Sequence, residues 1–374
     1  MDKALLPAGF YDSLFPEAGR KAAIMANLYG YLHRFGYELV EPPVIEFENS
    51  LFTGAGKALK NQTFRLMDPV SHKMMGVRSD ITTQVARIAV TRLKKAPKPL
   101  RLSYGGDVFR VKGEGLYAER QLTQSGIELV GSDNAASDAE VVLVTVAALQ
   151  NLGLKNICVD FTLPALIGII LDEMKYEKDE RAALLNAINK KNIAEIERLA
   201  GANAQILTRL ASPGITIEEL AKTKLPTDAK PLCTRLAEVI NIIKKSGEEV
   251  NVSIDPSESE KFGYHTGIGF TIFVQNAKGE IGRGGRYEIE DEDGAVPAVG
   301  ATIYINEILR ILLPSGKQQD KIYVPYGTNW SAVKNLLEGS AVVICGVKEV
   351  PNIIHEAKEQ NCSFIFDGEE VVKA

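Results

Sequence analysis

The feature that most constrains the fold is a change of pattern along the chain. Strand-like runs alternate with helices over residues 37–162, and strand patterns return after residue 250 at "VNVSIDP", "YHTGIGFTIFVQ" and "GEIGRGGRYE". Between them, residues 163–247 read as short amphipathic helices rich in Ala, Leu, Lys and Glu, with no strand pattern. We therefore predict an α+β fold, in which an antiparallel sheet flanked by helices carries a helical insertion at about residues 163–247.

Helix and linker signals divide the rest of the chain. Helices are expected over residues 16–35, where Gly36 provides a stop, and over residues 135–151. The turn-rich segment "PSGKQQD", which begins at Pro314, reads as a linker. We predict a main domain at residues 1–318 and a small C-terminal α/β domain at residues 319–374, with a strand–helix–strand–helix–strand pattern.

Composition excludes several classes of protein. A net charge of −5 over 374 residues argues against a large nucleic-acid footprint. The four histidines are scattered, so no zinc site is expected, and the widely spaced cysteines suit free thiols in a reducing compartment. The N-terminus lacks the pattern of a signal peptide, and no apolar stretch reaches membrane-spanning length. We expect a cytoplasmic protein that binds neither nucleic acid nor membrane.

A polar strand follows a loop rich in charges and glycines. In "QLTQSGIELVG", the residues Gln124, Gly126 and Glu128 alternate and so share one face of a sheet, with Ile127 and Leu129 on the other. This pattern describes the polar floor of a binding site. On periodicity alone, the solvated face of an edge strand is slightly favoured, and both interpretations stay open.

Two other segments also allow two interpretations. Asp80 in "RSDITTQVAR" stands where a helix N-cap would lie, which is the simpler role, but it is also placed to meet an ammonium group. The glycine-rich stretch "GRGGRY", residues 282–287, does not match a phosphate-binding loop, because the lysine and the following helix are missing. A tight β-turn with close backbone approach is the expectation there.

The order of the motifs resembles histidyl-tRNA synthetase, a class II synthetase, over roughly residues 5–312. The matching segments are, in order, "GYELVEPPVIE", "RSDIT", "FRVKGEGLYAERQLTQSGIELVG", "YHTGIGF", "GGRYE" and "VGATIYINEIL". Residues 36–46, 109–131 and 299–309 correspond to the three class II motifs. The resemblance implies a class II fold whose antiparallel sheet carries the site and whose first motif builds a dimer interface.

The resemblance also implies a histidine-binding site. Most of the polar positions of the synthetase's amino-acid site are kept, although its glutamate is shortened to Asp80, its proline is Ser79, and one tyrosine of a pair is His265. A histidine ligand needs a carboxylate for its ammonium group, donors for its carboxylate and a partner for its imidazole. The implied histidine-binding residues are Asp80, Thr82, Arg110, Gln124, Glu128, Tyr264 and His265.

The positions that handle ATP in the synthetase have changed. Lys112, Tyr117, Ala118 and Arg120 stand where its motif 2 has the pattern Arg-x-Glu and then Gly-Arg-x-Arg. Two further arginine positions are occupied by Glu260 and Glu307, which reverses the charge. Because amino-acid activation by ATP requires stabilised negative charge, carboxylates at these positions disfavour it. No catalytic residues, cofactor or metal are therefore expected.

A synthetase-like chain that keeps the amino-acid site but has lost the ATP site resembles the regulatory subunits of ATP phosphoribosyltransferase. In that family the subunit pairs with a short catalytic subunit in a hetero-octamer, activates it, and mediates histidine feedback inhibition at the first step of histidine biosynthesis. The alternatives are a divergent synthetase-like ligase that activates histidine and a regulator that senses uncharged tRNA. The C-terminal piece resembles a reduced anticodon-binding domain, with surface packing or an oligomer contact as its expected role.

Overall fold

The computed structural model describes residues 6–52, 54–113, 119–258, 264–312, 320–339 and 341–374. The chain divides into two compact units, Met1–Leu312 and Leu313–Ala374.

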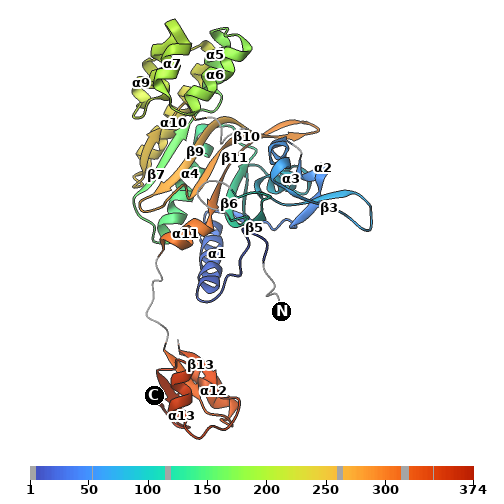
Figure 1. The fold of residues 1–374 in the computed structure, drawn as a ribbon, viewed down its shortest axis with the longest axis vertical. Coiled ribbons are helices and arrows are strands. Elements are labelled where there is room, and N and C mark those ends of the chain that lie inside the picture. The colour runs from blue at the N-terminus through green and yellow to red at the C-terminus, as the bar shows by residue number, and fades with distance from the viewer. Residues whose placement is uncertain (1–5, 53, 114–118, 259–263, 313–319, 340) are drawn as a thin grey trace. The chain divides into compact units, whose positions relative to one another are not determined.

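An eight-stranded sheet forms the centre of the larger unit (Figure 1). Neighbouring strands pair antiparallel, except that β1 pairs parallel with β5 and β7 pairs parallel with β8. The strands in spatial order are β1 (Glu38–Leu39), β5 (Leu100–Phe109), β6 (Gln121–Val130), β11 (Gly294–Tyr304), β10 (Gly282–Asp291), β9 (His265–Val274), β7 (Ile157–Thr162) and β8 (Asn251–Ile254).

The two faces of this sheet have different partners. Helices α1 (Glu17–His33) and α4 (Ala135–Asn151) share a core with Ile127, Ala301 and the other residues of that face. On α1 the buried positions are Ile24, Leu28 and Leu32, which recur every four residues as an amphipathic helix requires. The other face packs Tyr104 and its neighbours against α3 (Thr82–Thr91). This second face carries the polar residues of β6.

A smaller three-stranded sheet precedes α3. Its strands in spatial order are β2 (Ile45–Phe47), β4 (Met74–Val77) and β3 (Phe64–Met67), with α2 (Glu48–Leu51) and a 3-10 helix, Gly54–Gln62, nearby in the chain. Helix α11 (Ile305–Ile311) directly follows β11. The small sheet and α3 thus bring residues 78–82 to the polar face of the large sheet.

The segment between β7 and β8 is entirely helical and lies together at one end of the large sheet (Figure 1). Its α-helices are α5 (Leu166–Glu173), α6 (Lys178–Asn189), α7 (Ile193–Ala200), α8 (Ala204–Ala211), α9 (Ile217–Lys222) and α10 (Lys230–Ser246). The buried carboxylate of Asp138 on α4 joins this segment to the sheet, because it accepts hydrogen bonds of 2.7 Å from Arg235 on α10 and 2.7 Å from Arg286 on β10.

The smaller unit has a four-stranded sheet of its own. In spatial order its strands are β13 (Val342–Cys345), β12 (Lys321–Val324), β14 (Phe364–Phe366) and β15 (Val371–Lys373), and its helices are α12 (Trp330–Leu336) and α13 (Ile353–Glu359). β12 pairs parallel with both β13 and β14, whereas β15 pairs antiparallel with β14. The strand–helix alternation of this unit follows the pattern read from the sequence, apart from the added β15.

Two local predictions need correction, and a third is confirmed in its chemistry. The stretch "GRGGRY" is no turn but the beginning of strand β10, where a bulge separates Gly285 from Tyr287. The polar strand β6 lies between β5 and β11, and both Gln124 and Glu128 are buried, so the edge-strand interpretation is wrong. Helix α3 has Ile81 at its N-cap position, but the capping role predicted for Asp80 is confirmed, because its carboxylate accepts the Thr82 N–H at 2.8 Å.

Candidate functional site

The seven residues implied in histidine binding come from four places in the fold. Asp80 and Thr82 lie at the start of α3, and Arg110 directly follows β5. Gln124 and Glu128 lie on β6, as the alternation predicted. Tyr264 and His265 stand at the beginning of β9. Hydrogen bonds and ring pairings link Asp80, Thr82, Gln124, Glu128, Tyr264 and His265, directly or through Tyr104 and Tyr287. We call the seven residues, together with Tyr104, Tyr287, Thr302 and Tyr304, the polar site.

Asp80 is held in place by α3 and β6. The Thr82 backbone N–H donates to its Oδ1 at 2.8 Å, and the Gln124 side-chain amide donates to its Oδ2 at 3.2 Å. The Gln124 Oε1 in turn accepts from the Ile81 N–H at 3.4 Å. The carboxylate therefore satisfies a helix amide, as an N-cap side chain would, while Asp80 itself stays partly exposed. Such a preoriented carboxylate suits an ammonium group.

Glu128 is the most perturbed acid of the site. It is 1% exposed, and the Tyr287 hydroxyl donates to its Oε2 at 2.8 Å. Burial raises the pKa of its carboxyl to about 8, and the negative charge of Asp80 adds to this, against the lowering effect of the Tyr287 hydrogen bond. At neutral pH this carboxyl is therefore largely protonated, which lets it donate a hydrogen bond from a buried position.

Hydroxyl groups connect the two acids, because Thr82, whose N–H bonds Asp80, also bonds Glu128 through its hydroxyl, as Tyr104 does. The Tyr104 hydroxyl lies 3.1 Å from Thr82 Oγ1 and 2.8 Å from Thr302 Oγ1, and all three residues are buried. Burial raises the pKa of the Tyr104 hydroxyl well above its usual value, and the charges of Glu128 and Asp80 raise it further. The floor of the polar site is therefore a neutral hydrogen-bonded network.

Aromatic rings and glycines shape the remaining side. The ring of Tyr264 stacks on His265 with 4.3 Å between centroids and meets the ring of Tyr287 edge-on at 5.8 Å. A Cβ at Gly285 would overlap the His265 imidazole, and one at Gly300 would overlap the Glu128 carboxyl. These glycines are required because side chains from neighbouring strands occupy the space above them.

The positive charges of two arginines, Arg283 and Arg110, influence Tyr304 at the other end of the polar site. Burial raises the pKa of Tyr304 to about 12, whereas the positive charges of Arg283 and Arg110 lower it. The Arg283 guanidinium lies 5.8 Å from the centre of the Tyr304 ring. The polar site thus has carboxyl groups on α3 and β6 and cationic groups near Tyr304.

Several of these residues were not predicted from the sequence. Tyr104, Arg283, Tyr287, Thr302 and Tyr304 were missed because their strands are remote in the chain and their register is set by the sheet. One signal was present: in "GRGGRY" the first arginine, the third glycine and the tyrosine alternate, so they share a face once the segment is recognised as a strand.

Two of the described positions that correspond to the ATP site of the synthetase, Arg120 and Glu307, are used structurally. The Arg120 guanidinium lies over the rings of Phe10 and Phe64, at 5.2 and 4.8 Å from their centroids, and donates to the Ala8 and Arg110 carbonyl oxygens. Glu307 forms an ion pair with Arg310 one turn along α11. Tyr117, Ala118 and Glu260 lie outside the described residues.

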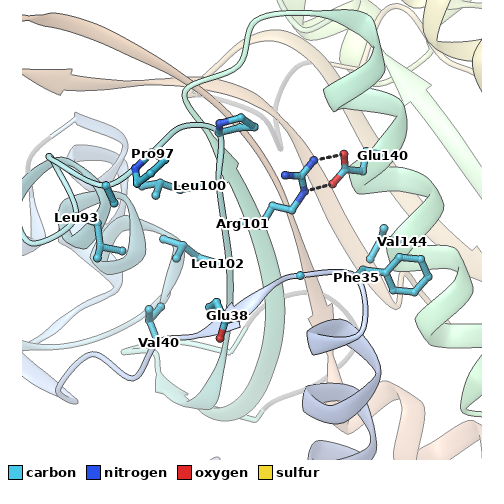
Figure 2. Close-up of a pocket in the computed structure, with 13 residues that line it drawn as sticks. Phe35, Glu38, Val40, Leu93, Pro97, Leu100, Arg101, Leu102, Glu140 and Val144 are labelled. Atoms are coloured by element: carbon cyan, nitrogen blue, oxygen red, sulfur yellow. Dashed lines mark hydrogen bonds and ion pairs between the residues drawn. The ribbon is translucent and has the colours of Figure 1, made fainter.

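A cavity of about 650 Å³ lies elsewhere on the larger unit (Figure 2). It is lined by residues of the α1–β1 junction, the segment after α3, β5 and α4, among them Phe35, Val40 and Leu93. Arg101 spans it and pairs with Glu140 at 2.6 and 2.8 Å (Figure 2). None of the seven implied histidine-binding residues lines this cavity.

The part of the chain that the structure describes contains no group of three or more His, Cys, Asp or Glu side chains able to hold a metal ion. Among the same residues, no helix has both the length and the apolar character needed to cross a membrane.

Comparison with known proteins decides the family. The family model of histidyl-tRNA synthetase matches residues 9–308. The ATP phosphoribosyltransferase regulatory subunit of Rhodospirillum centenum is 40% identical, with 98% of this chain and 95% of that protein covered. The one from Paramagnetospirillum magneticum is 41% identical over 100% of this chain and 98% of its own length. The chain belongs to the family of ATP phosphoribosyltransferase regulatory subunits.

Solved structures agree with this family at the level of the fold. An ATP phosphoribosyltransferase regulatory subunit/histidyl-tRNA synthetase from Bacillus halodurans superposes with a TM-score of 0.81 at 22% identity, covering 97% of both chains. Histidyl-tRNA synthetase from Nostoc superposes with a TM-score of 0.78 at 16% identity, covering 98% of this chain and 91% of its own. The class II synthetase-like fold predicted from the motifs is confirmed.

Proposed function

We propose that this regulatory subunit binds histidine in the polar site and transmits its presence to a short-form ATP phosphoribosyltransferase catalytic subunit, which it also activates. The observation that carries the proposal is the pair of positioned acids, Asp80 and Glu128, held on one face of the sheet by Gln124 and Tyr287. The two acids differ in environment, since Asp80 is partly exposed and Glu128 is buried.

Each acid suits a different group of histidine. The partly exposed Asp80 carboxylate, with Gln124 beside it, matches an ammonium group. Glu128 is largely protonated at neutral pH, and a free imidazole with an ordinary pKa near 6.5 is largely neutral. The buried O–H can therefore donate to the imidazole nitrogen, as a hydrogen bond or with full proton transfer to an ion pair. Arg110 supplies positive charge for the carboxylate end.

Regulation requires histidine to bind the inhibited arrangement of the complex more tightly than the active one. A coupling free energy of about 1–3 kcal/mol is typical of such effects. By linkage, the catalytic subunit must then alter histidine affinity by the same factor. The proposed complex is a hetero-octamer, and its place is the first step of histidine biosynthesis in the cytoplasm.

We also propose that two copies of the chain associate through the segment at residues 36–46. Apolar side chains in and beside it are unusually exposed: Phe35, Leu39, Val44, Ile45 and Phe47 are 41–51% exposed. The cavity of Figure 2 borders the same segment. Exposed apolar side chains gathered in one segment in this way favour a protein–protein contact. The C-terminal unit is proposed to be a reduced anticodon-binding domain without an RNA-binding role.

The direct test is reconstitution with a short-form catalytic subunit. ATP phosphoribosyltransferase activity is measured with the catalytic subunit alone, after addition of this protein, and after addition of histidine. We expect activation by the protein and inhibition by histidine. Absence of activation would contradict the proposal. ATP–pyrophosphate exchange with histidine tests the ligase alternative, and sustained exchange by the protein alone would support that alternative instead.

A further inference from the structure

Arg283 is a charged residue beside the polar site to which no group of the ligand has been assigned. Arg283 on β10 stands opposite Thr302 on β11 and Thr271 on β9. Residues directly opposite in a sheet point to the same face, and Thr302 bonds the Tyr104 hydroxyl within the polar site. Arg283 therefore faces the site. Arg286, three residues later, faces the opposite way and is held by Asp138 on α4.

The guanidinium of Arg283 is fixed from one side. Its Nε donates to Glu280 Oε1 at 3.0 Å, and its Nη2 donates to the same oxygen. Across the described parts of the chain, no hydrogen bond is made by its Nη1 group, and the side chain is 29% exposed. Because an arginine presents its donors in a rigid fork, a partner on one edge leaves the other edge oriented for a second acceptor.

The Arg283 guanidinium lies 5.8 Å from the centre of the Tyr304 ring, and its charge acts on the aromatic rings of the site. Arg283 lowers the pKa of both Tyr304 and Tyr264, and Asp80 raises the pKa of both, although burial is the largest influence on each. A cation and a carboxylate therefore act on the same two rings. An α-amino acid carries its ammonium and carboxylate groups on one carbon, so it needs a complementary pair of this kind at short separation.

We propose that Arg283 binds the free carboxylate of the ligand and makes the site selective for an unmodified amino acid. The inference rests on the proposed function, namely that the polar site binds histidine. Glu280 acts as a positioning residue, because it holds the guanidinium edge that faces away from the ligand. A ligand whose carboxylate is missing or esterified loses the charge-assisted hydrogen bond and binds more weakly.

The test compares histidine with histidinol, which carries a hydroxymethyl group in place of the carboxylate. Both are titrated by calorimetry into the full-length wild-type protein, Arg283→Ala, Arg283→Lys and the surface control Arg198→Ala, whose arginine is 65% exposed on α7. We expect the wild type to prefer histidine by about tenfold or more, as loss of a charge-assisted hydrogen bond implies. In Arg283→Ala, histidine should bind more weakly while histidinol affinity stays within about twofold of the wild-type value, so that the preference is lost. Arg283→Lys should restore part of the preference.

The outcomes separate this inference from the proposed function. If the wild type binds histidine and histidinol equally, or if Arg283→Ala keeps the wild-type preference, the role of Arg283 is refuted while the histidine site stands. If Arg283→Ala weakens both ligands equally, the residue is structural and the inference is again refuted. If the wild type binds neither ligand, the proposed function fails, and this inference fails with it. Circular dichroism of each variant establishes that it is folded.

Discussion

The buried acid Glu128 should make the stability of the larger unit depend on pH. In the folded protein its carboxyl keeps its proton up to about pH 8, whereas in the unfolded chain it releases the proton near the ordinary value of 4.5. Between these values the folded state binds more protons, so raising the pH favours unfolding. The stabilising effect of the neutral carboxyl is complete below about pH 4.5 and is lost as the pH rises to about 8.

The size of this effect follows from the two pKa values. An interval of about 3.5 pH units corresponds to about 5 kcal/mol in the free energy of unfolding. Glu128→Gln keeps a neutral hydrogen-bonding side chain of nearly the same shape but cannot ionise. We expect the variant to resemble the wild type near pH 5 and to exceed its stability progressively toward pH 8, by up to about 5 kcal/mol.

The assay is urea unfolding at several pH values from 5 to 9, followed by near-ultraviolet circular dichroism of the buried tyrosines. Tryptophan fluorescence is unsuitable, because the single tryptophan, Trp330, lies in the C-terminal unit. Glu288→Gln on β10 removes an exposed carboxyl and controls for the change in net charge. If the profiles of Glu128→Gln and the wild type run parallel across this range, the reasoning about Glu128 is refuted.

Four further predictions follow from the same contacts. Gly300→Ala should cost about 1–3 kcal/mol in urea unfolding, because its Cβ would overlap the Glu128 carboxyl, whereas Gly279→Ala has open space and should cost far less. Gly30→Ala, exposed within α1, should stabilise by about 0.5–1 kcal/mol in the same assay. Asp138→Ala should destabilise by about 3 kcal/mol, since it removes the buried carboxylate that Arg235 and Arg286 share and leaves both with the more exposed Asp133 as an ionic partner. In calorimetry, histidine affinity should be nearly constant between about pH 6.5 and about 8, and should fall on either side as imidazole and Glu128 both gain or both lose a proton.

Much of the fold was predictable because local signals agreed with tertiary structure. The helix at residues 135–151 was predicted with its observed bounds, Ala135–Asn151, and the Asn134 side chain caps it by accepting the Ser137 N–H. The alternation of Gln124 and Glu128 correctly placed them on one face. What periodicity could not show was the position of their strand within the sheet, because that depends on pairing with β11, more than 150 residues later in the chain.

The glycine-rich stretch shows why the remainder was missed. Glycines favour turns locally, yet Gly285 lies within strand β10, where the His265 side chain occupies the space above it. Its partner on β11, Gly300, leaves room for the Glu128 side chain in the same way. This demand comes from other strands and leaves no local signal. Tyr287 was not predicted for the same reason, because its contact with Glu128 depends on the register of three strands.

The central claim is that histidine in the polar site controls the catalytic subunit. The most direct measurement is the histidine inhibition curve of ATP phosphoribosyltransferase in the complex reconstituted with the wild-type protein and with Glu128→Ala, which lacks any donor for the imidazole. We predict that the variant still activates the catalytic subunit but needs about tenfold or more histidine for half-inhibition, because the hydrogen bond from the Glu128 carboxyl to the imidazole is lost. Inhibition curves that coincide would contradict the claim that this site senses histidine.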